Sequence, residues 1–514
     1  MDSALALTPS TLRVVLLLGL ALAQEDDPWS RVRVDVPDHP QAIATSLYGS
    51  VLEAPPQDGT PWRIEEAPDP HDFTGSWNAW EGAEAIGAEA WHDAGFTGEG
   101  VSVAVFDVQW YGADLRWEEL GVFETWDCWA HPGCVTPMDS LRPRFSYEGG
   151  SHGVACAEVV RDLAPGVDLH LVRTNGVTTF ENAVDWAIRE DIDVVTLSMS
   201  FMNGSFYDGT GPVSRLVSRL TEGGTLLVTS AGNYADGHWM EPFKDGDGDG
   251  LHEFPWGSEY LPVWIKAGKK RGLTVQWDNY SRCGDVDFDL VLYNREGEVL
   301  GIADADQDPE ADRCSPVERL APTLLEDQWT WLQVKRRRGD GAVRWNLITT
   351  TGQVFNSMPE YSVTDPGTSP LAFTVGAAAA RNYLHGDLEN FSSWGPNMAG
   401  DPTPDIVAPD GVTTATYGPT GFYGTSAASP AAAAAIALVM SRYPEMDAFD
   451  AAAWLEDHAW GGGSTWEAAD NAHGAGYLRL PAPEGELPGC GGRAIGWMGL
   501  LLWPLWGRRP KEER

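Results

Sequence analysis

The sequence predicts an α/β fold: a mostly parallel sheet with helices on both faces, into which an antiparallel β-sandwich is inserted. Residues 101–228 alternate short, β-branched strand segments with helical segments, and the same alternation returns between residues 371 and 443. Such alternation favours a parallel sheet that is covered on both faces. Residues 256–356 instead hold short runs of period two separated by Gly, Asp and Pro, which is typical of an antiparallel sandwich.

Each element is expected from its own local pattern of apolar residues. In the α/β part we expect strands at 101–106, 194–197, 225–228 and 371–377, and helices at 180–190 and 213–220. In the sandwich we expect strands at 273–277, 288–292, 329–334 and 343–348. The chain is therefore divided into a discontinuous α/β domain, residues 76–255 and 357–483, and an inserted sandwich, residues 256–356.

Composition bounds the class of protein. The 514 residues are 43% hydrophobic, so the chain is globular and long enough for two or three domains. The formal net charge of −41 argues against nucleic-acid or anionic-membrane partners, because like charges repel. This balance fits a soluble protein that works outside the cell. We also expect a monomer.

The first residues are typical of an export signal. Arg13 precedes the apolar run 14–23, which ends in the small-x-small triplet 21–23. Residues 1–23 are therefore expected to be a signal peptide, with a buried N-terminal helix as the alternative. Residues 24–75 are acidic and proline-rich, as expected of a linker or short prosegment.

Residues 424–430, with the sequence GTSAASP, place a serine at the start of an alanine-rich helix. A serine hydroxyl is a poor nucleophile unless a base removes its proton. At a helix N-terminus, Ser426 would expose its hydroxyl beside backbone N–H groups that can hold a developing oxyanion. The alternative is an ordinary N-capping serine before a core helix.

Three further polar side chains stand in places that suit catalysis. His152 begins a helix of small residues and titrates near neutrality, as a general base must, although a structural histidine is the alternative. Asp107 ends an apolar strand, where open α/β sheets place their sites, and could orient an imidazolium; the alternative is a turn-capping aspartate. Asn233 also follows a strand, and its amide could donate to an oxyanion.

In the order Asp, His, Asn, Ser, these residues resemble the subtilase family of serine peptidases. The resemblance covers roughly residues 76–255 and 357–482 and rests on six blocks in the family's order. The blocks are 98–107, 150–157, 187–200, 391–396, 404–409 and 424–430.

The resemblance implies a subtilisin-like sheet and a secreted serine endopeptidase that acts through an acyl-enzyme. Ser426 would attack the scissile carbonyl, and His152 would take its proton and pass it to the leaving amine. Asp107 would hold His152. Asn233, with the backbone N–H of Ser426, would hold the oxyanion. No cofactor is implied for catalysis.

The resemblance also places the substrate. A protein or peptide would lie as an added strand along Ser198, Met199 and Ser200. Ser200 stands where the family usually has glycine, which would narrow the specificity cleft.

A second departure from the family follows Asp107, where Val108 and Gln109 replace the usual small hydroxyl residue and glycine. It leaves open a catalytically inactive subtilase fold that serves as a binding protein. A carboxyl peptidase of the sedolisin kind would need a glutamate at His152 and an aspartate at Asn233, so the sequence argues against it. Residues 24–75 are also shorter than a full inhibitor-type prodomain.

The insert, residues 256–356, resembles the small β-sandwich of the prepeptidase C-terminal type. Contact with substrate or a surface and a purely structural role both remain open. Before it lies a candidate calcium loop. Its carboxylates are Asp245, Asp247 and Asp249 at positions one, three and five, and Glu253 at position nine. Trp256 occupies position twelve, where such loops carry glutamate. Calcium as a structural ion is the expectation, and a solvated acidic turn is the alternative.

Six cysteines are present, and export permits disulfides. The simplest pairing joins Cys128 to Cys134 and Cys283 to Cys314, although four cysteines allow three connectivities. Reduced, buried cysteines are the alternative.

The C-terminal residues 484–514 carry Cys490, an apolar stretch at 494–506 and a basic end. This order resembles the C-terminal sorting tails of Gram-negative surface proteins, especially the myxosortase type. The resemblance implies cleavage near Cys490 by a sorting peptidase, possible lipid attachment there, and a mature protein at the cell surface or released from it. The alternative is a C-terminal helix that packs on the catalytic domain.

Overall fold

The structure, a computed structural model, describes most of the globular part of the chain. The described residues are 80–129, 132–135, 150–202, 204–267, 272–307, 315–350, 352–383, 388–461 and 470–483. The expected signal peptide, prosegment and sorting tail lie outside them. Within the described residues, no helix is both long and apolar enough to cross a membrane.

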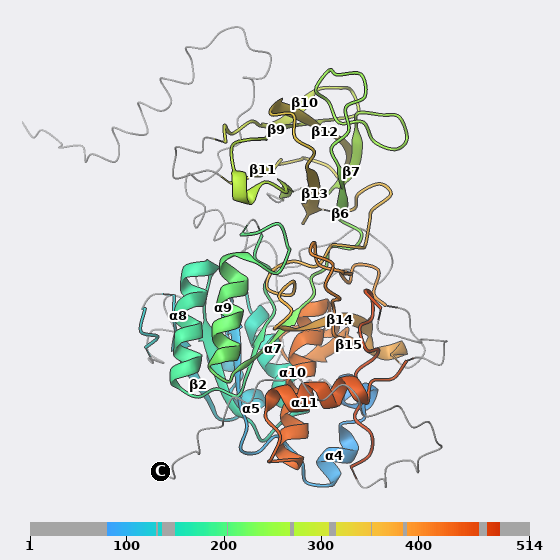
Figure 1. Ribbon diagram of the computed structural model, residues 1–514. Coiled ribbons are helices and arrows are strands. Elements are labelled where there is room, and N and C mark those ends of the chain that lie inside the picture. The colour runs from blue at the N-terminus through green and yellow to red at the C-terminus, as the bar shows by residue number, and fades with distance from the viewer. Residues whose placement is uncertain are drawn as a thin grey trace, which may run out of the picture.

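The centre of the α/β part is a parallel sheet, as the sequence predicted. Within the described residues it has seven strands in the order β15-β14-β5-β4-β1-β3-β2. Their bounds are β1 Ser102–Asp107, β2 Phe123–Asp127, β3 Asp168–Arg173, β4 Val194–Leu197, β5 Leu226–Ser230, β14 Phe373–Ala379 and β15 Ile406–Asp410. Nearly all residues of the central strands are buried, because helices cover both faces. Figure 1 shows this layered arrangement.

Successive residues of β1 point to opposite faces, as in any strand, and so belong to two apolar cores. Val103 and Val105 pack with α7 and α10, whereas Ala104 and Phe106 pack with α8 and α9. The helices are α3 Trp80–Ile86, α4 Glu89–Asp93, α5 Trp117–Leu120, α7 His152–Leu163, α8 Gly176–Arg189, α9 Gly211–Glu222, α10 Thr425–Arg442 and α11 Ala448–Asp457. Short 3₁₀ turns are η1 Ala113–Leu115, η3 Tyr280–Arg282 and η4 Ala380–Asn382, and β16 Val412–Thr414 pairs with β17 Gly418–Phe422.

Helix α10 lies in the middle of the domain and is buried from Thr425 to Val439. Its alanines carry small side chains, so the helix lies close to α7 and to the strands beneath it. This packing places the first turn of α10 at the carboxyl edge of the sheet, where β1 and β5 also end.

Within the described residues, the inserted part consists of two four-stranded sheets, β10-β9-β12-β7 and β11-β8-β13-β6, which Figure 1 shows above the α/β domain. The strands are β6 His238–Pro242, β7 Leu261–Ile265, β8 Leu273–Trp277, β9 Asp287–Tyr293, β10 Val299–Ala303, β11 Val317–Leu320, β12 Gln328–Arg338 and β13 Arg344–Thr349. The expected boundary at residue 256 is too late, because β6 pairs with β13 inside the sandwich. The candidate calcium loop therefore lies within this part of the chain.

The sandwich and the α/β domain share one apolar cluster. Met240 of β6 and Ile348 of β13 pack with Met202, Phe206 and Tyr234 of the α/β domain. Residues 202 and 206 directly follow the expected substrate strand, so the sandwich supports the chain that leaves it.

Candidate active site

Asp107 occupies the last position of β1 and is fully buried. Its Oδ1 accepts hydrogen bonds from the backbone N–H groups of Val108 at 2.7 Å and Gln109 at 2.9 Å. Its Oδ2 lies 2.7 Å from Nδ1 of His152. The two residues that depart from the family pattern thus hold the carboxylate through their main chain, which needs no side-chain hydroxyl.

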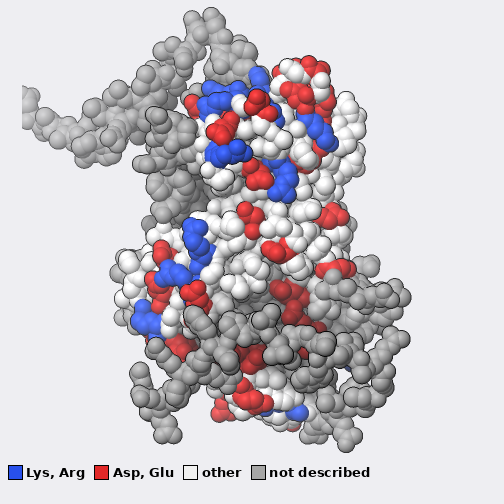
Figure 2. All heavy atoms as spheres, in the orientation of Figure 1, with Lys and Arg blue, Asp and Glu red and all other residues white. Residues whose placement is uncertain are grey.

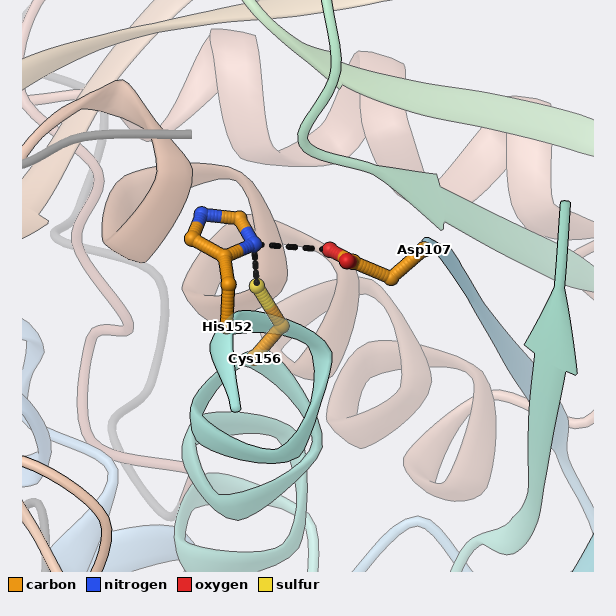
Figure 3. Close-up of side chains that lie close together, drawn as sticks. All are labelled: Asp107, His152 and Cys156. Atoms are coloured by element: carbon orange, nitrogen blue, oxygen red, sulfur yellow. Dashed lines mark hydrogen bonds and ion pairs between the residues drawn. The ribbon is translucent and has the colours of Figure 1, made fainter. Parts of the chain in front are cut away.

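His152 begins α7 and presents its ring to the end of β1 (Figure 3). The next residue must be glycine, because a Cβ on Gly153 would lie 2.6 Å from Cβ of Asp107. The ring packs edge-on against Phe422, with the ring centroids 5.4 Å apart. Among the described residues, the buried Nε2 atom of His152 has no hydrogen-bond partner. With Nδ1 donating to Asp107, Nε2 is the nitrogen that can accept a proton.

Electrostatics favour the protonated imidazole. Burial lowers the pKa of His152, but Cys156 and Asp107 oppose this and the pKa is raised overall. Burial also raises the pKa of the Cys156 thiol, so that group is neutral near pH 7 and the Asp107 carboxylate is the partner that acts there.

Ser426 is the second residue of α10 and is buried, with 5% of its surface exposed. Pro430 follows four residues later and lacks the N–H that would normally donate to the Ser426 carbonyl. Ser198 Oγ donates to that carbonyl at 3.0 Å instead, and Cys156 Sγ donates at 3.6 Å. The nucleophile segment is thereby connected to both the histidine helix and the end of β4.

Asn233 follows β5 and has its side-chain oxygen engaged. Oδ1 accepts hydrogen bonds from the N–H of Thr425 at 2.9 Å and from its Oγ1 at 2.8 Å. These bonds orient the side chain so that the acceptor end faces Thr425 and the NH₂ end remains the donor. The backbone N–H groups in the first turn of α10 lack intrahelical acceptors, so amide donors from two elements converge near Ser426.

The expected substrate strand directly follows β4. Ser198, Met199 and Ser200 are 4%, 1% and 4% exposed, and Ser198 contacts the Ser426 carbonyl. The next residue, Phe201, donates its N–H to the carbonyl of Asp365 at 2.7 Å, which ties this segment to the loop before β14.

Comparison with known proteins decides the class. Residues 333–478, which include the Ser426 segment, match the model of the Subtilase family. The chain is a subtilisin-like serine peptidase. The fold of this peptidase is similar to that of the CspB protease of Clostridium perfringens, at 16% identity and a TM-score of 0.55, over 78% of this chain and 97% of that one.

A second solved structure is also similar. The epidermin leader peptide processing serine protease EpiP of Staphylococcus aureus is 13% identical, with a TM-score of 0.40, over 82% of each chain. No curated protein matches the peptidase.

The candidate calcium loop joins the peptidase's sandwich by backbone pairing. The carboxylate atoms of Asp245, Asp247 and Asp249 lie within 4.8 Å of one another. A Cβ on Gly246 would lie 2.9 Å from Oε2 of Glu253, so that carboxylate also lies over the loop. Partial burial and nearby carboxylates, Asp249 first, raise the pKa of Glu259.

Glu259 was missed from the sequence because its spacing fits no loop pattern. It is nevertheless an additional carboxylate near this loop, whose position twelve lacks one. The Gly250 carbonyl accepts the N–H of Arg336 at 2.8 Å, which fastens the loop to β12.

The structure contains the expected Cys128–Cys134 disulfide. Cys283 is also disulfide-bonded, while Cys314 lies outside the described residues. Cys156 is a buried free cysteine, 3.8 Å from Nδ1 of His152. Sequence reasoning gave it no role, although its place four residues after His152 on one helix predicts that the two side chains are neighbours.

Proposed function

We propose that this peptidase is an exported endopeptidase that cleaves protein or peptide substrates through an acyl-enzyme on Ser426. The observation that carries the proposal is His152, whose Nδ1 faces Asp107 while its buried Nε2 has no hydrogen-bond partner among the described residues. That is the arrangement a general base needs.

The first half of the reaction would begin at Ser426. His152 Nε2 takes the hydroxyl proton as Oγ attacks the scissile carbonyl carbon. The imidazolium that forms is stabilised by the Asp107 carboxylate at 2.7 Å. His152 then gives the proton to the leaving amine, and the acyl group stays on Ser426. A water molecule then attacks the acyl carbonyl carbon as His152 takes its proton, and His152 returns a proton to Ser426 Oγ as the acyl C–O bond breaks.

The oxyanion of each tetrahedral intermediate would be held by the Asn233 amide and the backbone N–H of Ser426. Thr425 supports this role because it holds Oδ1 of Asn233 through two hydrogen bonds. Fixed donors need no reorganisation as charge develops, and the loss of one such donor costs about 10²–10³ in kcat.

The substrate would pair as an extra strand with Ser198, Met199 and Ser200, so that main-chain hydrogen bonds give affinity and side-chain pockets give specificity. Because Ser198 donates to the Ser426 carbonyl, the substrate strand and the nucleophile are held in one register.

Substitution of the catalytic groups tests the proposal. Ser426→Ala and His152→Ala should each abolish casein hydrolysis while the circular dichroism spectrum and the melting temperature stay close to those of the wild type. If either variant hydrolyses casein at the wild-type rate, the assignment is wrong. If the wild-type chain is folded but inactive on casein and on peptide mixtures, the inactive binding protein is the better reading.

We further propose that calcium is a structural ion in the loop 245–253, held by Asp245, Asp247, Asp249 and Glu253, with Glu259 nearby. The closeness of three carboxylates supports it. The loop is clamped to β12, so the ion would stiffen the sandwich rather than take part in peptide hydrolysis.

Export and surface display remain proposals that rest on sequence alone. Residues 1–23 would be removed as a signal peptide, and residues after about Cys490 would be removed by a sorting peptidase in a Gram-negative bacterium. Mass spectrometry of the protein from its native cells tests both. An intact C-terminus at Arg514 in a soluble fraction would refute the sorting proposal, and unchanged localisation of Cys490→Ala would count against lipid attachment.

A further inference from the structure

Three carboxylates are buried together in the sandwich, and strand β12 separates them from the loop 245–253, because Lys335 of β12 pairs with Asp289 on one side and with Leu251 on the other. Asp287 and Asp289 point to the same face of β9, and Glu318 lies on β11 of the opposite sheet. Their exposed fractions are 0%, 8% and 2%. Carboxylates are rarely buried to this degree unless they are paired or bind a cation.

The hydrogen bonds that normally compensate burial are weak at these carboxylates. Burial raises the pKa values of all three; the backbone N–H groups of Gln307 and Ala305 oppose this at Asp287 and Glu318, and Arg337 opposes it at Asp289. Among the described residues, however, both carboxylate oxygens of Asp287, Oδ1 of Asp289 and Oε1 of Glu318 have no hydrogen bond of normal distance and angle. A buried polar atom without a partner is costly, and four such atoms on three neighbouring side chains call for a missing ligand.

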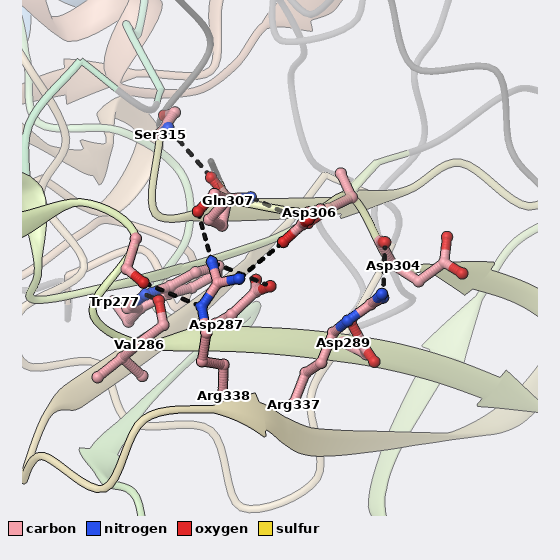
Figure 4. A network of polar contacts seen from close by, with 12 residues as sticks. Trp277, Val286, Asp287, Asp289, Asp304, Asp306, Gln307, Ser315, Arg337 and Arg338 are labelled. Carbon is pink, nitrogen blue, oxygen red and sulfur yellow. Dashed lines mark hydrogen bonds and ion pairs between the residues drawn. The ribbon is translucent and has the colours of Figure 1, made fainter. Parts of the chain in front are cut away.

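The two nearest arginines, Arg337 and Arg338, do not supply the missing hydrogen bonds. Arg338 Nη2 lies 3.8 Å from Oδ2 of Asp287, and Arg337 Nη1 lies 3.7 Å from Oδ1 of Asp289, both beyond hydrogen-bond distance. Figure 4 shows that both arginines engage other groups. Arg338 donates to Asp306 at 3.0 Å and to the carbonyl of Gln307, and Arg337 donates to the carbonyl of Asp304 at 3.3 Å.

The local charge is negative. Asp304 and Asp306 follow β10 and face the same cluster, so that five carboxyl groups stand against three cations, Arg337, Arg338 and Lys335. Burial and repulsion by Asp289 raise the pKa of Asp287 to about 6. Burial also raises the pKa of Glu318, with further contributions from Asp287 and Asp289. Figure 2 shows basic and acidic side chains side by side on the surface of the sandwich, whereas these three acids lie beneath it.

We propose that Asp287, Asp289 and Glu318 form a second binding site for a divalent cation, and that the cation is calcium. The groups that face the cluster are carboxylate and carbonyl oxygens, the hard donors that calcium and magnesium prefer. Calcium suits this site better than magnesium, because the three carboxylates come from two different sheets, and calcium accepts irregular geometry and longer bonds. Bound calcium would join β9 to β11 across the sandwich.

The test measures how calcium changes the melting temperature of the full chain in a background of two substitutions. Ser426→Ala prevents self-digestion, and Asp247→Ala removes the loop site. In this background, calcium added after chelation should still raise the melting temperature. Adding Asp287→Asn and Glu318→Gln should abolish that rise. The same pair should leave the melting temperature in chelator unchanged or higher, because two mutually repelling buried charges have been removed.

A purely structural role predicts the opposite change in melting temperature. If the carboxylates serve only as partners of Arg337 and Arg338, the two substitutions will lower the melting temperature in chelator and leave the calcium-induced rise unchanged. That result would show that the proposal is wrong. Asp278→Asn is the matched control, since it is an exposed aspartate of the same sandwich that pairs with Arg344 at 3.1 Å. It should change neither quantity.

Direct titration tests the proposal even if the double variant does not fold. Isothermal titration with calcium of the Ser426→Ala, Asp247→Ala chain should show one bound ion, and Asp289→Asn should weaken its affinity at least tenfold. No bound ion in a folded chain, or an affinity unchanged by Asp289→Asn, would overturn the proposal. Neither outcome bears on the role of Ser426, which is tested separately by casein hydrolysis.

Discussion

The hydroxyl of Ser198 donates to the carbonyl oxygen of Ser426 at 3.0 Å, in the place of the helical hydrogen bond that Pro430 cannot make. One side chain therefore couples the end of β4, where we expect substrate to pair, to the first turn of α10. Because Pro430 removes a rigid helical bond, the position of the nucleophile depends on a contact from outside its own helix.

Ser198→Ala should lower kcat/KM about 5- to 100-fold, because it removes the nearer donor of a buried carbonyl at a cost of about 1–3 kcal/mol and leaves only the weaker Cys156 thiol at 3.6 Å. The effect should appear mainly in kcat, since the nucleophile is displaced while the main chain of the substrate strand remains. Ser218→Ala is the control, because Ser218 Oγ donates to the Ser214 carbonyl within α9, far from the site. Equal losses in both variants would show that the Ser198 contact has no special role.

Gly153→Ala should lower kcat/KM by at least about 100-fold, because small displacements of catalytic groups are this costly. The added Cβ would meet Cβ of Asp107 at 2.6 Å and the carbonyl of Gln109 at 2.9 Å, and these groups cannot move without shifting His152. Gly133→Ala, where a Cβ would meet nothing within 4 Å, is the control and should be active. A fully active Gly153→Ala enzyme would mean that the spacing of Asp107 and His152 is uncritical.

The pH dependence of kcat/KM should place the ionisation of the catalytic base above the ordinary histidine pKa of about 6.5. The base works only when neutral, and the carboxylate of Asp107 raises the pKa of His152, so activity should rise with pH through this higher value and be lost below it. In Asp107→Asn, burial then dominates, and the ionisation should move to a lower pH while the maximal rate falls about 10⁴-fold.

Cys156→Ala distinguishes the effect of Cys156 on the pKa of His152 from the effect of Asp107. Burial keeps this thiol neutral near pH 7, so its removal should leave the ionisation of His152 much closer to the wild-type position than Asp107→Asn does. An ionisation that moves equally far in both variants would show that Cys156 bears charge in the active enzyme.

Much of the fold was predictable, because local patterns reflect local structure. The strands expected at 194–197 and 273–277 have the same bounds as β4 and β8, and each lies within a sheet that buries its side chains. The boundary of the sandwich was not predictable. Strand β6 pairs with β13 about a hundred residues later, and no local pattern near residue 238 reveals that partner.

The site shows the same division. Side chains at strand ends and helix starts could be placed from the sequence, since parallel strands bring their carboxyl ends to one edge of a sheet. The contacts of Ser198 and Cys156 with the Ser426 carbonyl could not, because they depend on how α7, α10 and β4 pack together. The sequence also could not show that Val108 and Gln109 are compatible with a hydrogen-bonded Asp107. The structure shows it, because the backbone N–H groups of both residues donate to the Asp107 carboxylate.

Chelation of calcium should lower the melting temperature of the wild-type chain, because an ion bound only to the folded state stabilises it. Asp247→Ala should remove the part of this shift that belongs to the loop 245–253. Glu259→Gln should weaken loop binding if its carboxylate completes the ligand set, while Glu296→Gln, an exposed glutamate in the turn between β9 and β10, should not. If neither the chelator nor Asp247→Ala changes the melting temperature, the loop is not a calcium site.

The most direct test of the central claim is labelling of the folded chain with a serine-directed fluorophosphonate, followed by peptide mapping. We predict a single labelled peptide that contains Ser426, with labelling lost in Ser426→Ala and in His152→Ala. A folded wild-type chain that takes up no label at Ser426, or labelling at Ser426 that persists in His152→Ala at the wild-type rate, would contradict the account.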